Sequence, residues 1–214
     1  NLIYRPGRSE APAIQAEVLN SDTAFDILKF EERDSKVRDI RLHRDFNNVL
    51  LMSMSSISSC LHVIDGTLPV YSESEAFLLK QVGAYSHVDR IIPNGTAPTP
   101  PSVIFGAEPE RNWCYYYQKA SLARQMGDWE QVVRLYREAN KLELETDDKS
   151  EMIPYLEALV NVGNYEDART VYAKQIKGSA AMRLPLCNTL TNDPGYPPEF
   201  GYDYEMINQI LCRE

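Results

Sequence analysis

The chain has 214 residues, of which 43% are hydrophobic and 25% are charged, and its formal net charge at pH 7 is −9. This composition is typical of a globular protein, and the length allows one large domain or two small ones. The acidic charge disfavours nucleic acid as a partner, because phosphate backbones would be repelled over most of the surface. The longest apolar run, roughly residues 49–54, is far too short to cross a bilayer, so we expect no direct membrane insertion by this chain.

Residues 1–92 are expected to form a small α/β lobe. Patterns of apolar and β-branched residues predict a serine-capped helix over residues 9–20, a helix over 71–85, and strands over 24–30, 36–42, 48–55, 61–65 and 87–92. Within the second helix, Ser72 and Glu75 have the spacing of a capping box. Strands that alternate with helices predict a small sheet with helical cover.

The clearest boundary in the chain is the proline-rich segment 93–109. Its prolines and two glycines disfavour regular structure. We therefore divide the chain into the α/β lobe 1–92, a connector 93–109 and a helical lobe 110–214.

The helical lobe contains an internal duplication. Residues 112–139 and 149–176 each read as a helix, a turn with a glycine and an aromatic residue, and a second helix. The turn glycines Gly127 and Gly163 are 36 residues apart. Residues 180–190 are expected to add a terminal helix that caps the stack.

The duplicated unit resembles the tetratricopeptide repeat, a pair of helices of about 34 residues, over residues 112–177. Val132 and Leu156 depart from the family pattern, since smaller residues are usual at their positions. The resemblance implies that the turn aromatics Trp129 and Tyr165 pack between helices. The residues on the family's aromatic and small packing positions are Tyr116, Ala120, Trp129, Tyr136 and Ala139 in the first copy, and Tyr165, Ala168 and Tyr172 in the second.

Two helix pairs fall below the usual minimum of three, so the N-terminal lobe is expected to supply the missing apolar surface. The predicted fold is α+β: a small α/β N-terminal lobe packed on a C-terminal tetratricopeptide-like helical lobe with capping helices. The resemblance also implies a concave groove, suited to an extended peptide or a polar ligand. Its expected binding residues are Tyr117, Arg124, Gln125, Glu157 and Asn161, and its other positions are Cys114, Ser121, Ser150, Ile153 and Val160.

The whole chain also resembles the C-terminal extracytoplasmic region of large bacterial multi-pass membrane proteins. The segments that carry this likeness are CLHVIDG, FGAEPERNWCYYYQKASLARQMGDWEQV, MIPYLEALVNVGNYEDA and MRLPLC. Many such proteins look like lipid-linked-sugar glycosyltransferases in their membrane portion. The likeness implies a chain on the outer side of a bacterial membrane, tethered through its parent protein. It also implies that any catalytic apparatus lies in the membrane portion.

Four cysteines are present, at positions 60, 114, 187 and 212, without a CxxC motif or a nearby histidine cluster, so no zinc site is expected. An even number permits two disulfides in an oxidising compartment, and buried free thiols are the alternative. The pair that we favour is Cys187 with Cys212, which bracket the tail rich in proline, glycine and tyrosine. In the chain-entropy model, closing a loop of that size contributes roughly 3 kcal/mol.

Catalytic chemistry has weak support in the sequence. His43 and His87 are each followed two positions later by an aspartate, so each could meet its carboxylate on one face of a strand as a base and its orienting group. A solvated ion pair explains the same spacing. The serine-rich run 53–60 lacks a nucleophile elbow, and the acidic segment 145–151 lacks the spacing of a calcium loop and reads as a loop between repeats. We expect no catalytic residue, metal or cofactor.

The favoured function is a non-catalytic binding or assembly module that recruits a protein, a peptide or a substrate to the membrane part of its parent protein. One alternative is an independent hydrolase or transferase that uses a His/Asp pair of the α/β lobe. A third is a cytoplasmic tetratricopeptide adaptor.

Overall fold

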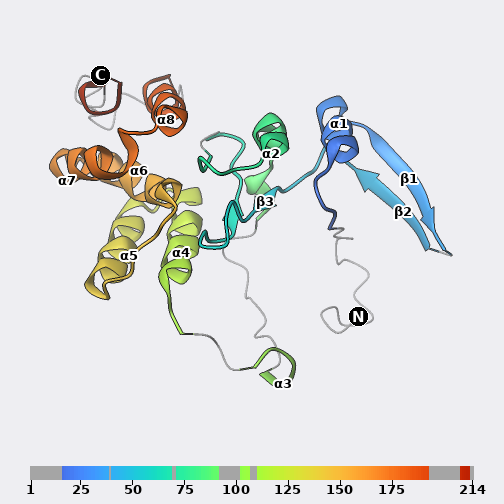
Figure 1. The fold of residues 1–214 in the computed structure, drawn as a ribbon, viewed down its shortest axis with the longest axis horizontal. Helices are drawn as coiled ribbons and strands as arrows, with labels where there is room; N and C mark the ends of the chain where they lie inside the picture. The colour runs from blue at the N-terminus through green and yellow to red at the C-terminus, as the bar shows by residue number, and fades with distance from the viewer. Residues whose placement is uncertain are drawn as a thin grey trace.

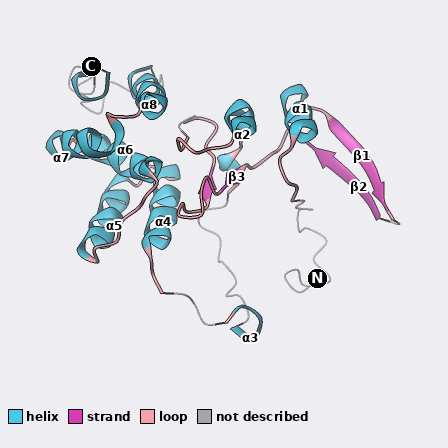
Figure 2. Cartoon of the chain, viewed as in Figure 1, coloured by secondary structure: helices cyan, strands magenta, loops and turns pink. Residues whose placement is uncertain are grey.

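The computed structural model of the protein describes residues 16–38, 40–68, 71–91, 102–106, 110–192 and 208–212. Within these residues the fold is mixed α+β, because small antiparallel hairpins come first and packed helices follow (Figure 1). Figure 2 shows the strands confined to the N-terminal half, with the helices after residue 113 gathered at the other end of the molecule.

Helix α1 (Ser21–Lys29) stands where a strand is expected over residues 24–30, so that expectation is wrong. The side chain of Asn20 caps the helix by accepting hydrogen bonds from two backbone N–H groups of the first turn, both at 3.0 Å. Ala24 and Ile27 are buried three positions apart, which is a helical spacing. Capping and this three-residue period outweigh the apparent alternation of apolar residues.

Strands β1 (Glu32–Val37) and β2 (Ile40–Asp45) form an antiparallel hairpin. The strand expected over residues 36–42 therefore comprises two strand ends and the turn between them. Val37 and Ile40, on either side of the turn, are β-branched, and the run of apolar and charged residues around them reads as one strand.

A second antiparallel hairpin joins β3 (Met52–Ser53) to β4 (His62–Val63). Both strands lie inside the segments expected to be strands. Among the described strands, however, the two hairpins belong to separate two-stranded sheets. The sheet with helical cover that the alternation of elements predicts is therefore not formed by these strands.

The helix expected over residues 71–85 is shorter in the structure. Helix α2 (Phe77–Val82) begins after Ala76, which makes no side-chain capping bond. Ser72 and Glu75 therefore form no capping box for this helix, and their side chains serve contacts described below. A 3-10 turn, Gly83–Tyr85, follows α2 directly.

The last expected strand, over residues 87–92, is instead a 3-10 turn, Val88–Arg90. A single parallel bridge between Val49 and Ser86 precedes it, after which the chain turns away. The N-terminal elements bury one small apolar cluster, composed of Ala24, Ile27, Phe46, Leu51, Ile64, Leu79 and Val82.

Parts of two expectations lie outside the described residues. Of the helix expected over residues 9–20, only 16–20 is described, and it is not helical. Of the connector 93–109, only 102–106 is described, and it contains the single-turn helix α3 (Ser102–Phe105). Gly106, at φ 78°, ends this turn. The expectation of no regular structure is wrong for residues 102–105, because this stretch contains no proline and can form one helical turn.

Five α-helices dominate the described part of the chain from residue 113 onward. The five helices are α4 (Trp113–Gln125), α5 (Trp129–Lys141), α6 (Ile153–Asn161), α7 (Tyr165–Val171) and α8 (Ala180–Asn192). A 3-10 turn at Lys149–Met152 precedes α6, a π-helical turn at Tyr172–Ile176 continues α7, and another at Asn208–Cys212 follows α8.

The pairs α4–α5 and α6–α7 are joined by matching turns. Gly127 and Gly163 both have left-handed backbones, with φ of 69° and 74°. The next residue in each turn caps the following helix: Asp128 accepts from the backbone of the third helical residue at 3.0 Å, and Asn164 does the same at 3.3 Å. The two turns therefore share one local chemistry, and membership of a repeat family stays a prediction.

A single apolar core runs through α4 to α8. Tyr116 is buried in it, and Trp129 and Tyr165 are partly buried against it. The aromatic stretch at the start of α4 thus contributes to the packing between helices. The residues with the lowest exposure in this core include Ala120, Val132, Leu156, Leu159, Ile176 and Leu186.

Candidate binding groove

The β3–β4 hairpin is fastened to the helical half by a disulfide. Cys60, next to β4, is bonded to Cys114 of α4, 54 residues later. A second disulfide joins Cys187 of α8 to Cys212, the pair favoured from the sequence. Two disulfides indicate an oxidising, extracytoplasmic location. No helix in the described part of the chain is long and apolar enough to cross a membrane.

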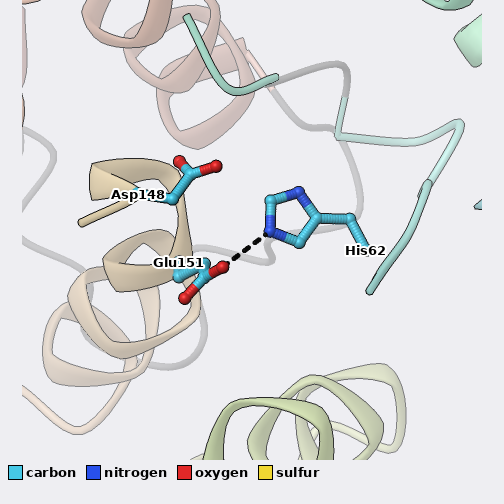
Figure 3. A group of neighbouring side chains, drawn as sticks. All are labelled: His62, Asp148 and Glu151. Atoms are coloured by element: carbon cyan, nitrogen blue, oxygen red, sulfur yellow. Dashed lines mark hydrogen bonds and ion pairs between the residues drawn. The ribbon is translucent and has the colours of Figure 1, made fainter. Parts of the chain in front are cut away.

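Beside the first disulfide, the carboxylate of Glu151 is fully buried and carries four hydrogen bonds. Its Oε1 accepts from the backbone N–H of Cys60 at 2.6 Å and contacts Nε2 of His62 at 3.1 Å. Its Oε2 accepts from the indole N–H of Trp113 and from the hydroxyl of Thr146, the latter at 2.7 Å. Figure 3 shows the imidazole of His62 pointing toward this carboxylate from the opposite segment. Glu151 therefore ties the hairpin, α4 and the loop before α6 to one another.

Asp148 is bound in a similar way by hydroxyl groups of the serine-rich run. Its Oδ2 accepts from Ser55 at 2.7 Å and from Ser59 at 2.8 Å, and its Oδ1 accepts from the backbone and hydroxyl of Ser150 at 3.0 and 2.6 Å. Burial raises the pKa of Asp148, but hydrogen bonds from Ser150, Ser55, Ser59 and Ser72 outweigh that effect and bring it to about 2. Asp148 is therefore a charged group that attaches the serine run to the helices.

A third link between the halves is an ion-pair cluster around Arg124 of α4. Its guanidinium donates to Asp65, which follows β4, at 2.6 Å, and to Glu157 of α6. Burial lowers the pKa of Arg124, but the two carboxylates, Glu157 first, raise it above its usual value. The next residue, Gln125, donates its amide to the backbone carbonyl of Val88. These contacts hold the N-terminal segments along one face of α4.

Between these links lies a groove of about 320 Å³. One wall comes from the chain around β4 and from the turn at residues 88–91, and the other from α4 and the start of α6. Its lining is mostly apolar and includes Leu61, Val63, Leu68, Val88, Leu122 and Ile153. The volume and lining are those of a site for a small ligand or a short segment of chain.

The structure places the five expected binding residues in two groups. Tyr117, Arg124 and Gln125 line the groove. Glu157 is 3% exposed and lies behind the groove as a partner of Arg124, and Asn161 donates to the backbone carbonyl of Glu157 at 2.8 Å. The groove thus has one wall of helical-lobe residues, as the resemblance implies, while its second wall comes from the N-terminal lobe.

An exposed apolar face continues the groove along the second hairpin. Met52 lies opposite Val63 in the register, and Met54 and Leu61 follow two residues along on the same face. All four are exposed, and Ile57 at the tip of the hairpin is entirely so. Because Leu61 and Val63 also line the groove, the face and the groove form one continuous apolar surface.

His62, Asp148 and Glu151 also meet the simplest requirement for a metal site. Their potential ligand atoms lie within 4.8 Å of one another, and all three side chains are buried. Each of the four carboxylate oxygens, however, already lies within hydrogen-bonding distance of two polar groups, such as the N–H of Cys60 and the hydroxyl of Ser55. Donor groups point positive charge at the oxygens, where a cation would have to bind. These residues therefore fit a hydrogen-bonded network better than a metal centre.

The residues of the expected His/Asp pairs are not among those that line the groove. The sequence pairs His43 with Asp45, whereas in the structure His43 hydrogen-bonds to Asp34, its cross-strand partner in the first hairpin, at 2.9 Å, because the hairpin register places the two side by side. This hydrogen bond raises the pKa of His43. His87 contacts Asp89 at 3.4 Å, and both side chains are well exposed. Of the three histidines, His62 lines the groove.

Sequence reasoning missed the residues that build the groove's frame. The signal lay in two segments interpreted separately: the serine-rich run 53–60, which has no nucleophile elbow, and the acidic segment 145–151, taken as a loop. One is rich in hydroxyl donors and the other in carboxylate acceptors, and the fold places them face to face. Glu75, interpreted as a capping residue, lines the groove instead.

Comparison with protein-family models, with curated protein sequences and with solved structures finds no match to this chain.

Proposed function

We propose that this chain is a non-catalytic, extracytoplasmic binding module of a larger bacterial membrane protein. It holds an extended peptide segment of a partner in the groove and so brings that partner to the membrane part of its parent protein. The observation that carries the proposal is the groove of about 320 Å³, mostly apolar, between a hairpin and a helix that are covalently joined. The sequence likeness to extracytoplasmic regions of bacterial membrane proteins and the two disulfides support the location.

Preorganisation supports binding at this groove. Its walls are held together by the Cys60–Cys114 disulfide, by the buried carboxylate of Glu151 and by the Arg124 cluster. A site whose walls are already fixed loses little conformational entropy when a ligand enters, and more of the contact energy appears as affinity. The exposed apolar face of the hairpin extends the groove in one direction, which suits an extended segment longer than the groove itself.

The chemistry of the groove favours binding over turnover. The carboxylates of Asp148 and Glu151 lie buried behind its wall, and their oxygens already accept hydrogen bonds from the protein. One observation supports the hydrolase alternative. His62 lines the groove, and its Nε2 lies within hydrogen-bonding distance of the carboxylate of Glu151, which is the arrangement of a base and its orienting carboxylate. The cytoplasmic adaptor is disfavoured by the two disulfides.

The test is selection of random linear peptides displayed on phage against the disulfide-intact protein. Selected peptides are then titrated against a Ser121→Trp variant, which fills the groove from α4, and an Arg134→Trp variant on the exposed face of α5. We expect Ser121→Trp to weaken binding at least about tenfold and Arg134→Trp to leave it unchanged. Failure to enrich any sequence, or equal binding by Ser121→Trp, overturns the proposal.

Mass spectrometry of the selected peptides after incubation separates the two functions. Intact peptides support the binding module. Cleavage that a His62→Gln variant abolishes favours the hydrolase.

A further inference from the structure

Glu75 is a buried carboxylate with one oxygen left without a partner. It is 7% exposed and lines the groove. Its Oε1 accepts from the hydroxyl of Ser53 at 2.7 Å and from the backbone N–H of Ala76 at 3.0 Å. Its Oε2 has no hydrogen-bond partner among the described residues. A buried acceptor of this kind is costly unless a donor reaches it, so Oε2 is suited to accept a hydrogen bond from a ligand in the groove.

The charges around the groove leave Glu75 uncompensated. Among the described residues of the lining, Arg124 is the permanent cation, and it is already bound to Asp65 and Glu157. Glu151, whose carboxylate contacts His62 of the lining, adds a further negative charge next to the groove. The groove therefore has an excess of carboxylates, which favours a positively charged ligand.

Tyr71 adds an aromatic wall next to this carboxylate. Tyr71 and Glu75 both line the groove, and the pKa of Tyr71 is raised first by burial and then by the charge of Glu75. An aromatic ring beside a carboxylate, within apolar walls, stabilises an ammonium group through cation–π attraction and a charge-assisted hydrogen bond.

We propose, resting on the function proposed above, that the groove takes a ligand with an apolar body and a protonated amine, and that Oε2 of Glu75 accepts the hydrogen bond from that amine. A basic side chain of a bound peptide and a free small amine share this chemistry. Leu61, Val63 and Leu122 contact the apolar part, while Tyr71 flanks the charge.

The experiment uses two matched pairs of probes on the full, disulfide-intact chain. One pair is phenylbutylamine and phenylbutanol. The other is acetylated and amidated leucyl-lysyl-leucine and its analogue with norleucine in place of lysine. Shifts of backbone amide NMR signals of groove residues give the affinity of each probe. Variants Glu75→Gln, Glu73→Gln and Ser121→Trp are titrated alongside, and Glu73 is the control because it is exposed and near in sequence.

On the unmodified protein, we expect the ammonium member of a pair to bind at least about tenfold more tightly than its neutral partner. Glu75→Gln should reduce that ratio to about twofold or less, and Glu73→Gln should leave it unchanged. If only the lysine peptide binds more tightly than its neutral analogue, the ligand is a peptide with a basic side chain. If only phenylbutylamine binds more tightly than phenylbutanol, the ligand is a free small amine. The ratio on the unmodified protein stands even if Glu75→Gln fails to fold.

Two outcomes separate failure of this inference from failure of the binding function. If both members of each pair bind equally well to the unmodified protein and neither binds to Ser121→Trp, the cation preference is overturned, but the groove remains a binding site. A preference that Glu75→Gln leaves intact also overturns the inference. No binding of any probe, together with no peptide selected from the library, overturns both proposals.

Discussion

Replacing Glu151 with glutamine tests whether its buried carboxylate holds the two halves together. The amide oxygen of glutamine can remain on the side of the Cys60 N–H, which is a donor and requires an acceptor. The NH₂ group then faces Thr146, whose hydroxyl can rotate to accept, and the indole N–H of Trp113, which is a donor only. One buried donor loses its acceptor, and the remaining bonds lose the strength that a charged partner provides. The expected loss of unfolding free energy is about 2–4 kcal/mol.

The loss is measured by urea unfolding at neutral pH with both disulfides intact. Glu138→Gln, at an exposed position on α5, is the matched control and should change stability by less than about 0.5 kcal/mol. In a double-mutant cycle, Trp113→Phe removes the orphaned donor, so Glu151→Gln should cost about 1–2 kcal/mol less in that background. A Glu151→Gln protein as stable as the control, or strict additivity with Trp113→Phe, would refute the reasoning.

Three further predictions concern the other links between the halves. Arg124→Met removes the cation that pairs with Asp65 and with the buried carboxylate of Glu157, and should cost about 3–5 kcal/mol in urea unfolding. Arg137→Met, at an exposed ion pair, should cost less than about 0.5 kcal/mol, and equal costs would contradict this account. Folding lowers the pKa of Asp148 from 3.8 to about 2, so its carboxylate contributes about 2 kcal/mol to the free energy of unfolding. This contribution is present above pH 4 and is lost as the pH falls through 2. The free energy of unfolding of Asp148→Asn should therefore fall less steeply with acid than that of the unmodified protein. Replacing both Cys60 and Cys114 by serine should lower the free energy of unfolding by about 4 kcal/mol. In the unmodified protein, non-reducing peptide mapping should recover the peptides of Cys60 and Cys114 linked to each other; a different pairing would contradict this prediction.

The helical half could be predicted in detail because its signals are local. Gly127 and Gly163 stop helices, and the cap residues after them start the next ones, so sequence spacing alone places α4 to α7 closely. Tyr116 is buried, as its packing position in the tetratricopeptide resemblance implies. Each of these features depends on neighbours within a few positions, which a single sequence displays.

The N-terminal half could not be predicted to the same depth. Short apolar runs such as residues 24–30 suit a helix or a strand, and the choice depends on which face finds a core. Residues 87–92 have strand-forming composition, but the isolated bridge between Val49 and Ser86 comes just before them, and Val88–Arg90 form a 3-10 turn. Whether such a segment becomes a strand depends on the partner with which it can pair, and that partner can be distant in sequence.

The sequence alone predicted the paired helices, the disulfide between Cys187 and Cys212, and three residues that line one groove wall, Tyr117, Arg124 and Gln125. Only the tertiary structure decided that a serine-rich run and an acidic loop, about ninety residues apart, would meet through Ser59 and Asp148. It also decided that Glu75 would turn into the groove rather than cap a helix. The physical reason is that a buried charge is tolerated only where donors from several segments converge on it, and no local pattern records that convergence.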